Sequence, residues 1–178
     1  MRQIHLMRSL AGGALLLAGL GGIALAQQDK NSVRTPNGLG FADFQGYEGW
    51  QVVSVSATPG VIDVIVGNPA MIAAYKTGLP AEGRKFPDGV KMAKIHWITA
   101  QNSEGGSPAT VPSALRDIDF MMRDATRFAA SGGWGYAQFN YDAAKDSFTP
   151  LGTGSACGFA CHTKVVAKDY VFTHFPKR

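Results

Sequence analysis

The stretch SACGFACHTK, residues 155–164, constrains this chain more than any other part of the sequence. It contains the only two cysteines among the 178 residues, Cys157 and Cys161, and His162 follows the second one directly. Two thiols that bond to the vinyl groups of a haem, followed by a histidine that binds the iron, form the attachment signature C-x-x-C-H. Here the spacing is C-x-x-x-C-H, and we expect a bulge at Gly158 to absorb the extra residue.

Two other interpretations of the cysteine pair stay open at this point. A disulfide needs Cβ atoms about 3.5–4.5 Å apart, whereas residues four apart on a helix place them about 5–6 Å apart. A disulfide would therefore require a non-helical turn. A zinc site needs a fourth ligand, and the neighbouring sequence offers none at metal spacing. The stretch favours covalent haem, with His162 as the iron ligand.

The first 26 residues have the features of an export signal. Arg2 and Arg8 precede a Gly-rich apolar run that ends in Ala-Leu-Ala. A positive start, an apolar middle and an A-x-A end are typical of a cleaved secretory signal peptide. The alternative is a membrane anchor, which requires about 20 apolar residues, and this run is shorter. We therefore expect the protein to be periplasmic, and the periplasm also permits disulfides.

Charge and composition limit the partners and the number of domains. The chain has 17 lysines and arginines against 13 acidic residues, and two of the arginines lie in the leader. No basic run alternates with aromatic residues, so nucleic acid and anionic membranes are poor candidates for partners. Residues 27–40 are polar and predict a flexible lead-in, and no second boundary follows. We expect one haem domain over residues 41–178.

Short β-rich runs alternate with turns along this domain. Composition and alternation predict strands at 50–57, 61–67, 91–99, 117–124, 134–142 and 170–175. Helices are expected at 69–77, where Asn68 can cap and Pro69 can begin the helix, at 125–131, and around the cysteines. The polar stretch 101–113 predicts a long loop. This mixture indicates an α+β fold, a mainly antiparallel β-sheet with a few short helices.

Five blocks of sequence resemble the cytochrome P-460 family and its relatives, the cytochromes c′-beta, in the order in which that family has them. They are FQGYEGWQVVSVS, VIVGNPAMIAAYKTG, FPDGVKMAKIHW, RDATRF and KDYVFTHF, and the resemblance covers most of residues 41–176. The third block carries a lysine five residues beyond its glycine, which is Lys94 here. The departure from the family pattern is the C-x-x-x-C-H spacing.

The resemblance implies a cofactor, an activity and partners. One covalent haem c would be attached through Cys157 and Cys161, with His162 on the iron and an open opposite face. In P-460 members a lysine is also bonded to the haem rim, and that position matches Lys94. The implied protein is a homodimer that oxidises hydroxylamine to nitric oxide or nitrous oxide and passes electrons to a redox partner such as a small soluble cytochrome. Cytochromes c′-beta lack the lysine bond and bind nitric oxide or carbon monoxide, which is the alternative function.

Strand phase separates the two lysines of the third block. Lys94 shares one face of the predicted strand with Met92 and His96, whereas Lys91 shares the other face with Ala93. The two lysines therefore cannot both point at one cofactor. On pattern alone Lys94 is a solvated strand residue, and the resemblance is what assigns it to the haem.

Asp119 is the candidate catalytic residue. It shares a strand face with Asp117 and Met121, and in the family this region lines the open side of the haem. A carboxylate there can take protons from hydroxylamine, a contribution of typically about 10²–10⁴-fold. The alternative is an exposed or structurally bonded carboxylate. Arg127, in the RDATRF block, is predicted to be either structural or a partner of a haem propionate.

A plain electron-transfer cytochrome is the third possible function. It would need a sixth iron ligand, and the candidates are His96, His174, Met92, Met121 and Met122. Each of these is more readily explained as a core or surface residue. The expectation is therefore an open site.

Overall fold

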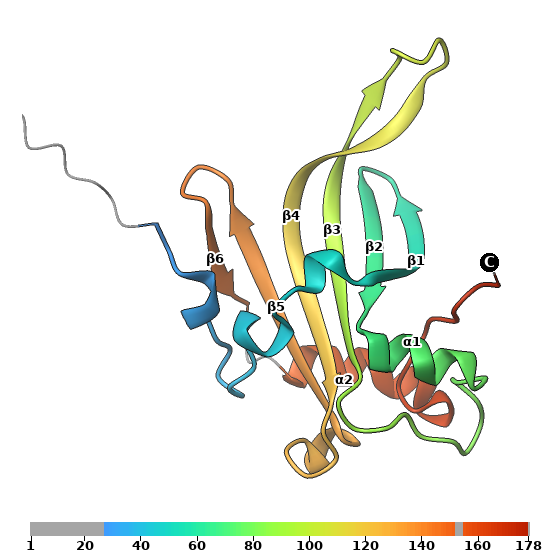
Figure 1. The fold of residues 1–178 in the computed structure, drawn as a ribbon. Coiled ribbons are helices and arrows are strands. Elements are labelled where there is room, and N and C mark those ends of the chain that lie inside the picture. Colours follow the sequence, from blue (N-terminus) through green and yellow to red (C-terminus); the bar gives the residue numbers. More distant parts are fainter. Residues whose placement is uncertain (1–26, 152–154, 178) are drawn as a thin grey trace, which may run out of the picture.

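The computed structural model describes residues 27–151 and 155–177, so the predicted leader, 1–26, lies outside the described residues. Its centre is a six-stranded antiparallel sheet in which strands adjacent in sequence are adjacent in space (Figure 1). The strands are β1 (Gln51–Thr58), β2 (Val61–Gly67), β3 (Lys91–Asn102), β4 (Ala109–Arg123), β5 (Trp134–Asp142) and β6 (Ser147–Pro150). The predicted α+β fold with a mainly antiparallel sheet is confirmed.

Two α-helices lie near the same end of this sheet (Figure 1). The first is α1 (Pro69–Lys76), where Asn68 caps the helix by accepting a 2.9 Å hydrogen bond from the Met71 amide. The second is α2 (Ser155–His162), which carries the cysteines as predicted. The remaining helical pieces are short 3₁₀ turns: η1 (Lys30–Ser32), η2 (Phe41–Phe44), η3 (Tyr47–Gly49), η4 (Ala129–Ser131) and η5 (Thr163–Lys168). Within the described ranges, no helix combines the length and apolar character needed to span a membrane.

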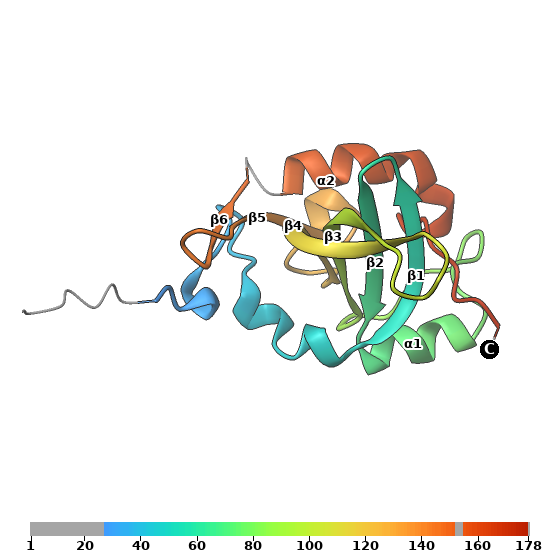
Figure 2. The ribbon, with the colours of Figure 1, turned by 90° about the horizontal axis from the view of Figure 1, so that it is seen from above.

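The sheet separates two cores because successive side chains of a strand point to opposite faces. On one face, side chains such as Ala93, Ile95 and Phe120 pack against the N-terminal segment up to Trp50. On the other face, Met92 and Met121 pack with side chains of α1 and of the C-terminal segment. The N-terminal segment and α2 lie on opposite sides of the sheet when it is seen from above (Figure 2). We call these two sides the aromatic face and the cavity face.

The predicted loop at 101–113 is wrong for most of its length. β3 continues to Asn102 and β4 begins at Ala109, and Gln101 pairs with Thr110. The resulting hairpin extends beyond the other strands (Figure 1). Cross-strand pairing carries the ladder through a polar sequence because both strands can supply backbone hydrogen bonds whatever their side chains are. The loop was predicted from composition alone, and composition does not reveal this pairing of β3 with β4.

Three further segments differ from the prediction. Residues 170–175, predicted as a last strand, form no strand, and β6 closes the sheet instead. Of the helix predicted at 125–131, only the 3₁₀ turn η4 is present. The lead-in predicted to be flexible is packed from Val33 onward. Its Leu39 is fully buried, and the Asn37 amide donates to the Tyr136 carbonyl at 2.9 Å.

Candidate functional site

A cavity of about 620 Å³ lies between the cavity face of the sheet, α2 and the C-terminal segment. Its wall is apolar over most of its area, with Ile65, Tyr136 and Phe172 among the lining residues. Cavities of about 300–1,000 Å³ with mainly apolar walls and a few convergent polar groups are typical binding sites for small molecules and cofactors. The polar groups here include Lys94, Asp119 and His162.

Strand register explains why these side chains meet. Residues directly opposite one another on neighbouring strands share a face, and the next pair on that face lies two residues along. Three such rows cross β3, β4 and β5 on the cavity face. The rows are Met92–Met121–Tyr136, Lys94–Asp119–Gln138 and His96–Asp117–Asn140. The first two rows line the cavity, and the third lies next to the second along the strands without lining the cavity.

Helix α2 supplies the opposite wall through Gly158, Cys161 and His162. It is helical through Gly158, so the bulge predicted there is absent. The glycine instead permits close packing, because a Cβ atom at this position would lie 2.6 Å from the Cβ of Tyr136. Cys161 is a free thiol, which removes the disulfide interpretation for it. The side chain of Cys157 lies outside the described part of the chain.

The ring of His162 is oriented by the chain that follows it. Its Nδ1 lies 2.6 Å from the carbonyl oxygen of Tyr170, so Nδ1 donates and Nε2 keeps its lone pair. Burial lowers the pKa of His162, which favours the neutral ring. Asp169, which precedes Tyr170, accepts a 2.8 Å hydrogen bond from the Phe86 amide and thereby fixes this turn. A neutral imidazole with one nitrogen bonded to a carbonyl is the usual form of a metal-binding histidine.

Lys94 and Asp119 face each other across β3 and β4, and each has a polar partner. The Nζ of Lys94 lies 3.0 Å from Oδ2 of Asp63 on β2. Oδ2 of Asp119 lies 3.0 Å from Nε2 of His96, whereas Oδ1 of Asp119 is buried and has no hydrogen-bond partner among the described residues. Asp119 therefore has one oxygen bound to His96 and one buried oxygen without a partner, and its side chain lines the cavity.

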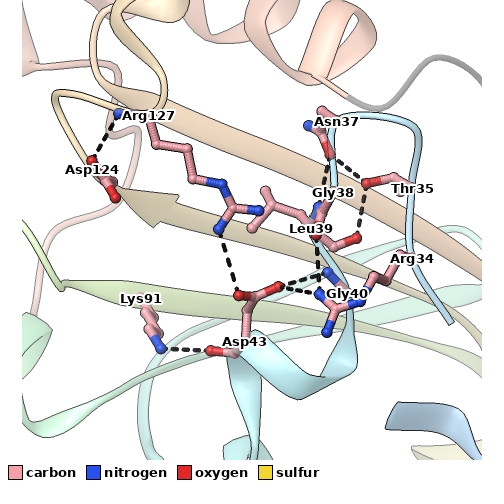
Figure 3. A network of polar contacts seen from close by, with 10 residues as sticks. All are labelled: Arg34, Thr35, Asn37, Gly38, Leu39, Gly40, Asp43, Lys91, Asp124 and Arg127. Carbon is pink, nitrogen blue, oxygen red and sulfur yellow. Dashed lines mark hydrogen bonds and ion pairs between the residues drawn. The ribbon is translucent and has the colours of Figure 1, made fainter. Parts of the chain in front are cut away.

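Lys91 and Arg127 both contact Asp43 of the N-terminal segment on the aromatic face (Figure 3), and neither lines the cavity. The ammonium of Lys91 donates to the backbone carbonyl of Asp43 at 2.5 Å. The guanidinium of Arg127 lies 3.5 Å from the carboxylate of the same residue. Strand phase correctly separated Lys91 from Lys94. Of the two roles left open for Arg127, the structure supports the structural one.

Comparison with known protein families identifies the family of this chain. The family model of cytochrome P460 matches residues 44–173, which is well over half of the chain. The chain belongs to the cytochrome P460 family. A comparison with individual curated proteins returned no match. Family membership implies that the protein is a haem cytochrome.

The cavity fits a haem by its own chemistry. A flat apolar macrocycle requires a wide apolar space, and Ile65, Met92 and Tyr136 line one here. An iron ligand requires a neutral imidazole with a free nitrogen, which His162 offers. Covalent attachment requires a thiol at the cavity wall, which Cys161 provides. The residues present therefore match the cofactor that the family implies.

The candidates for a sixth ligand are divided by the sheet. Met122 belongs to the core of the aromatic face, and His174 is exposed and does not line the cavity. Both ring nitrogens of His96 lie within 3.0 Å of carboxylate oxygens. Met92 and Met121 line the cavity, but both also pack in the core beside α1. The histidine candidates are thus occupied or remote.

Sequence analysis missed the partners of the site residues. Asp63 was not singled out, and His96 was considered only as an iron ligand. One signal was present, because Asp63 is a lone acid inside the apolar run VIDVIVG. Acidic residues are rarely buried unless they are paired, so this position already indicated a buried cationic partner.

Proposed function

We propose that the protein is an exported c-type cytochrome that oxidises hydroxylamine towards nitric oxide or nitrous oxide. In this proposal one haem is attached through Cys157 and Cys161, with His162 on the iron and Lys94 bonded to the haem rim. Electrons pass to a small soluble cytochrome in the periplasm, and the protein is a homodimer. The support comes from the family and from the residues of the cavity.

One observation carries the proposal. A single cavity brings together a thiol, an oriented neutral histidine, a lysine and a carboxylate from three separate parts of the sequence: Cys161, His162, Lys94 and Asp119. A gas-binding site needs the thiol and the histidine. The additional carboxylate suits a reaction in which protons must leave the substrate.

Each residue has a definable task in this reaction. When bound, the haem supplies the iron that accepts electrons from the hydroxylamine nitrogen. His162 presents Nε2 to the metal because its Nδ1 is bonded to Tyr170. Asp119 accepts a substrate proton on its carboxylate, which lies at the cavity wall. The apolar wall excludes water, so a fixed base matters more than it would in solution.

The cofactor is tested by mass under denaturing conditions. Protein made in a host with haem-attachment machinery should retain the mass of one haem after unfolding. The double variant Cys157→Ala, Cys161→Ala should lose that mass completely. Release of free haem from the wild-type protein would exclude covalent attachment.

The reaction is tested with hydroxylamine and an artificial electron acceptor. Asp119→Ala should still bind hydroxylamine, seen as a spectral shift, but should turn it over roughly 10²–10⁴-fold more slowly. Asp119→Glu should keep part of the rate. Asp124→Ala is the control, because the side chain of Asp124 accepts hydrogen bonds from the Thr126 and Arg127 amides and does not line the cavity. Equal rates for Asp119→Ala and the wild type would reject the base.

A gas-binding function is the second candidate, and one contact favours it. Lys94 lies in an ion pair with Asp63, and a charged ammonium is not a nucleophile. If Lys94 keeps that pair when haem is present, no bond to the haem rim forms. The protein would then bind nitric oxide or carbon monoxide tightly and show no turnover of hydroxylamine.

A further inference from the structure

A buried cluster of charged side chains adjoins the cavity, centred on His96. Oδ1 of Asp63 lies 2.7 Å from its Nδ1, and Oδ2 of Asp119 lies 3.0 Å from its Nε2. Oδ1 of Asp117 approaches the same Nε2 at 3.4 Å. His96 and Asp117 are 6% and 5% exposed. Three carboxylates from β2 and β4 thus surround one imidazole from β3.

Two cationic side chains complete the cluster in this structure. Lys94 pairs with Asp63 at 3.0 Å, and the Arg116 Nε donates to Oδ2 of Asp117 at 2.6 Å. A second nitrogen of Arg116, Nη2, lies 3.3 Å from Nδ1 of His96. Three carboxylates against these two cations leave one negative charge, and a lysine bonded to the haem rim would leave two. A protonated His96 offsets one of these charges, and uncompensated charge is unfavourable where it is buried, as it is at Asp63 and Asp117.

Hydrogen-bond chemistry leads to the same protonation state. A carboxylate accepts hydrogen bonds and donates none, and a neutral imidazole has one N–H and one bare nitrogen. Nε2 of His96 is hydrogen-bonded to Oδ2 of Asp119, and Oδ1 of Asp63 lies 2.7 Å from Nδ1. In a neutral ring protonated at Nε2, the bare Nδ1 would accept from Nη2 of Arg116 at 3.3 Å but would face the Asp63 oxygen at the shorter distance. In the imidazolium, that repulsion becomes an attraction between opposite charges. Burial by itself would lower the pKa of His96, but the hydrogen bond and charge of Asp119 and the charge of Asp117 raise it.

We propose that His96, as a buried imidazolium, is a positioning residue that holds the carboxylate of Asp119 in place at the cavity wall. This inference rests on the proposed function. In the step concerned, a proton moves from the substrate to the Asp119 carboxylate while its bonding electron pair stays on the substrate. The Asp119–His96 pair changes from neutral to singly positive, and the proton later leaves to solvent. His96 itself gains and loses nothing in this step.

The charge state of His96 is tested by nuclear magnetic resonance of the histidine-labelled holoprotein. The chain has four histidines, of which one lies in the predicted leader. The signal of His96 is the one that disappears from the spectrum of His96→Gln. We expect His96 to be protonated at pH 7 and to titrate above the ordinary value of about 6.5. Asp119→Asn should lower its midpoint because a main partner is lost. A neutral ring at pH 7, or a midpoint that Asp119→Asn leaves unchanged, overturns the inference.

Kinetics tests the positioning role. His96→Gln keeps a hydrogen-bond donor but loses the charge, so hydroxylamine should still bind while kcat falls by at least about tenfold. The loss should be smaller than the roughly 10²–10⁴-fold that removal of the base itself would cause. His96→Lys, which restores a cation, should recover part of the rate. His174→Gln is the matched control, because His174 is exposed and outside the cavity. An unchanged kcat in His96→Gln rejects the role.

The two proposals fail in different ways. A wild-type protein that binds but never oxidises hydroxylamine removes the proposed function, and the positioning role with it. A neutral His96 in an active enzyme overturns this inference and leaves the function intact. The histidine titration gives its answer in both cases because it does not depend on turnover.

Discussion

The two faces of one sheet have opposite chemistry although they are built from the same strands. On β3, Ala93 and Ile95 pack in the aromatic face, and their neighbours Lys94 and His96 belong to the cavity face. β4 alternates in the same way, with Phe120 beside Asp119. Period-two alternation therefore lets one strand stabilise the fold and carry the site. A substitution should affect stability or function according to the parity of its position.

The aromatic face is filled, whereas the cavity face is hollow. The ring of Phe120 stacks on Phe44 with centroids 4.2 Å apart and meets Phe41 edge-on at 5.1 Å. Such pairs add to the stability gained from burial. The cavity face has a volume of about 620 Å³ without protein atoms and a row of charges beside it. The stability of this face should therefore depend on what fills it, because a ligand that binds only the folded state stabilises that state.

The largest difference is expected between two adjacent residues of β4. Phe120→Ala should lower the free energy of unfolding by about 3–5 kcal/mol, because it removes a ring from a filled core. Asp119→Ala should lower it by only about 1 kcal/mol, the size of one lost hydrogen bond. Urea unfolding followed by circular dichroism measures both. Similar losses for the two variants would show that the faces do not divide stability in this way.

Two glycines give a second, smaller contrast. In Gly135→Ala the new Cβ would lie 2.4 Å from Phe128 on the aromatic face, and in Gly158→Ala it would lie 2.6 Å from Tyr136 under α2. Overpacking of this kind costs typically about 1–3 kcal/mol. Both variants should thus be less stable than the wild type. Only Gly158→Ala moves the helix of Cys161 and His162, so only it should reduce haem attachment.

The yield of covalent haem per chain distinguishes these two variants. It is measured as the ratio of haem absorbance to protein in purified, denatured samples. Equal haem yields at equal losses of stability would mean that α2 tolerates a displacement from Tyr136. The close approach of Gly158 would then be a matter of packing alone.

A pH-dependent effect, smaller than the glycine effect, is expected on the cavity face. Because the folded-state pKa of His96 is raised, its contribution to stability is fully present below the unfolded value of about 6.5. This contribution is lost as the pH rises through the folded pKa. The pKa of Asp63 is lowered, with burial opposed by the hydrogen bond and charge of Lys94, so its contribution is lost only at acidic pH.

The difference in unfolding free energy between the wild type and His96→Gln measures this effect. It should be largest at mildly acidic pH and should shrink towards alkaline pH. The same subtraction removes the opposite trend of His162, whose pKa burial lowers. His174→Gln should show no such trend. A difference that grows with pH would mean that His96 is neutral in the folded protein.

Local signals predicted the parts of the fold that depend on neighbouring residues. The strands at 61–67 and 134–142 match β2 and β5 to the residue, and Asn68 caps α1 as expected. Residues 170–175 alternate like a strand and form none. Alternation predicts which side chains are buried, but a strand also needs a free sheet edge, and the sequence does not state that β1 and β6 form the edges.

The candidate site was likewise predictable only in part. Strand phase placed Lys94 and Asp119 on one face because phase is a property of each strand alone. Their partners Asp63 and His96 depend on the register between strands. A shift of register by one residue would turn every such side chain to the other face. The ladder of Asp63, His96 and Asp117 was therefore not predictable from any one segment.

The two lysines of β3 give the smallest expected change in stability and the sharpest test of the two faces. Lys91→Ala removes one hydrogen bond to Asp43 and a contact with the Phe44 ring at 5.9 Å, which should cost about 0.5–1.5 kcal/mol. Its haem spectrum should equal that of the wild type. Lys94→Ala should leave the haem attached, since the thiols are untouched, but should return a red-shifted ferrous spectrum to that of an ordinary c-type haem. Lys94→Arg, which keeps a cation for Asp63 but cannot supply a neutral amine at ordinary pH, separates the ion pair from the rim bond. If both Lys94 variants have the wild-type spectrum, no rim bond exists, and the cavity face holds Lys94 for Asp63 alone.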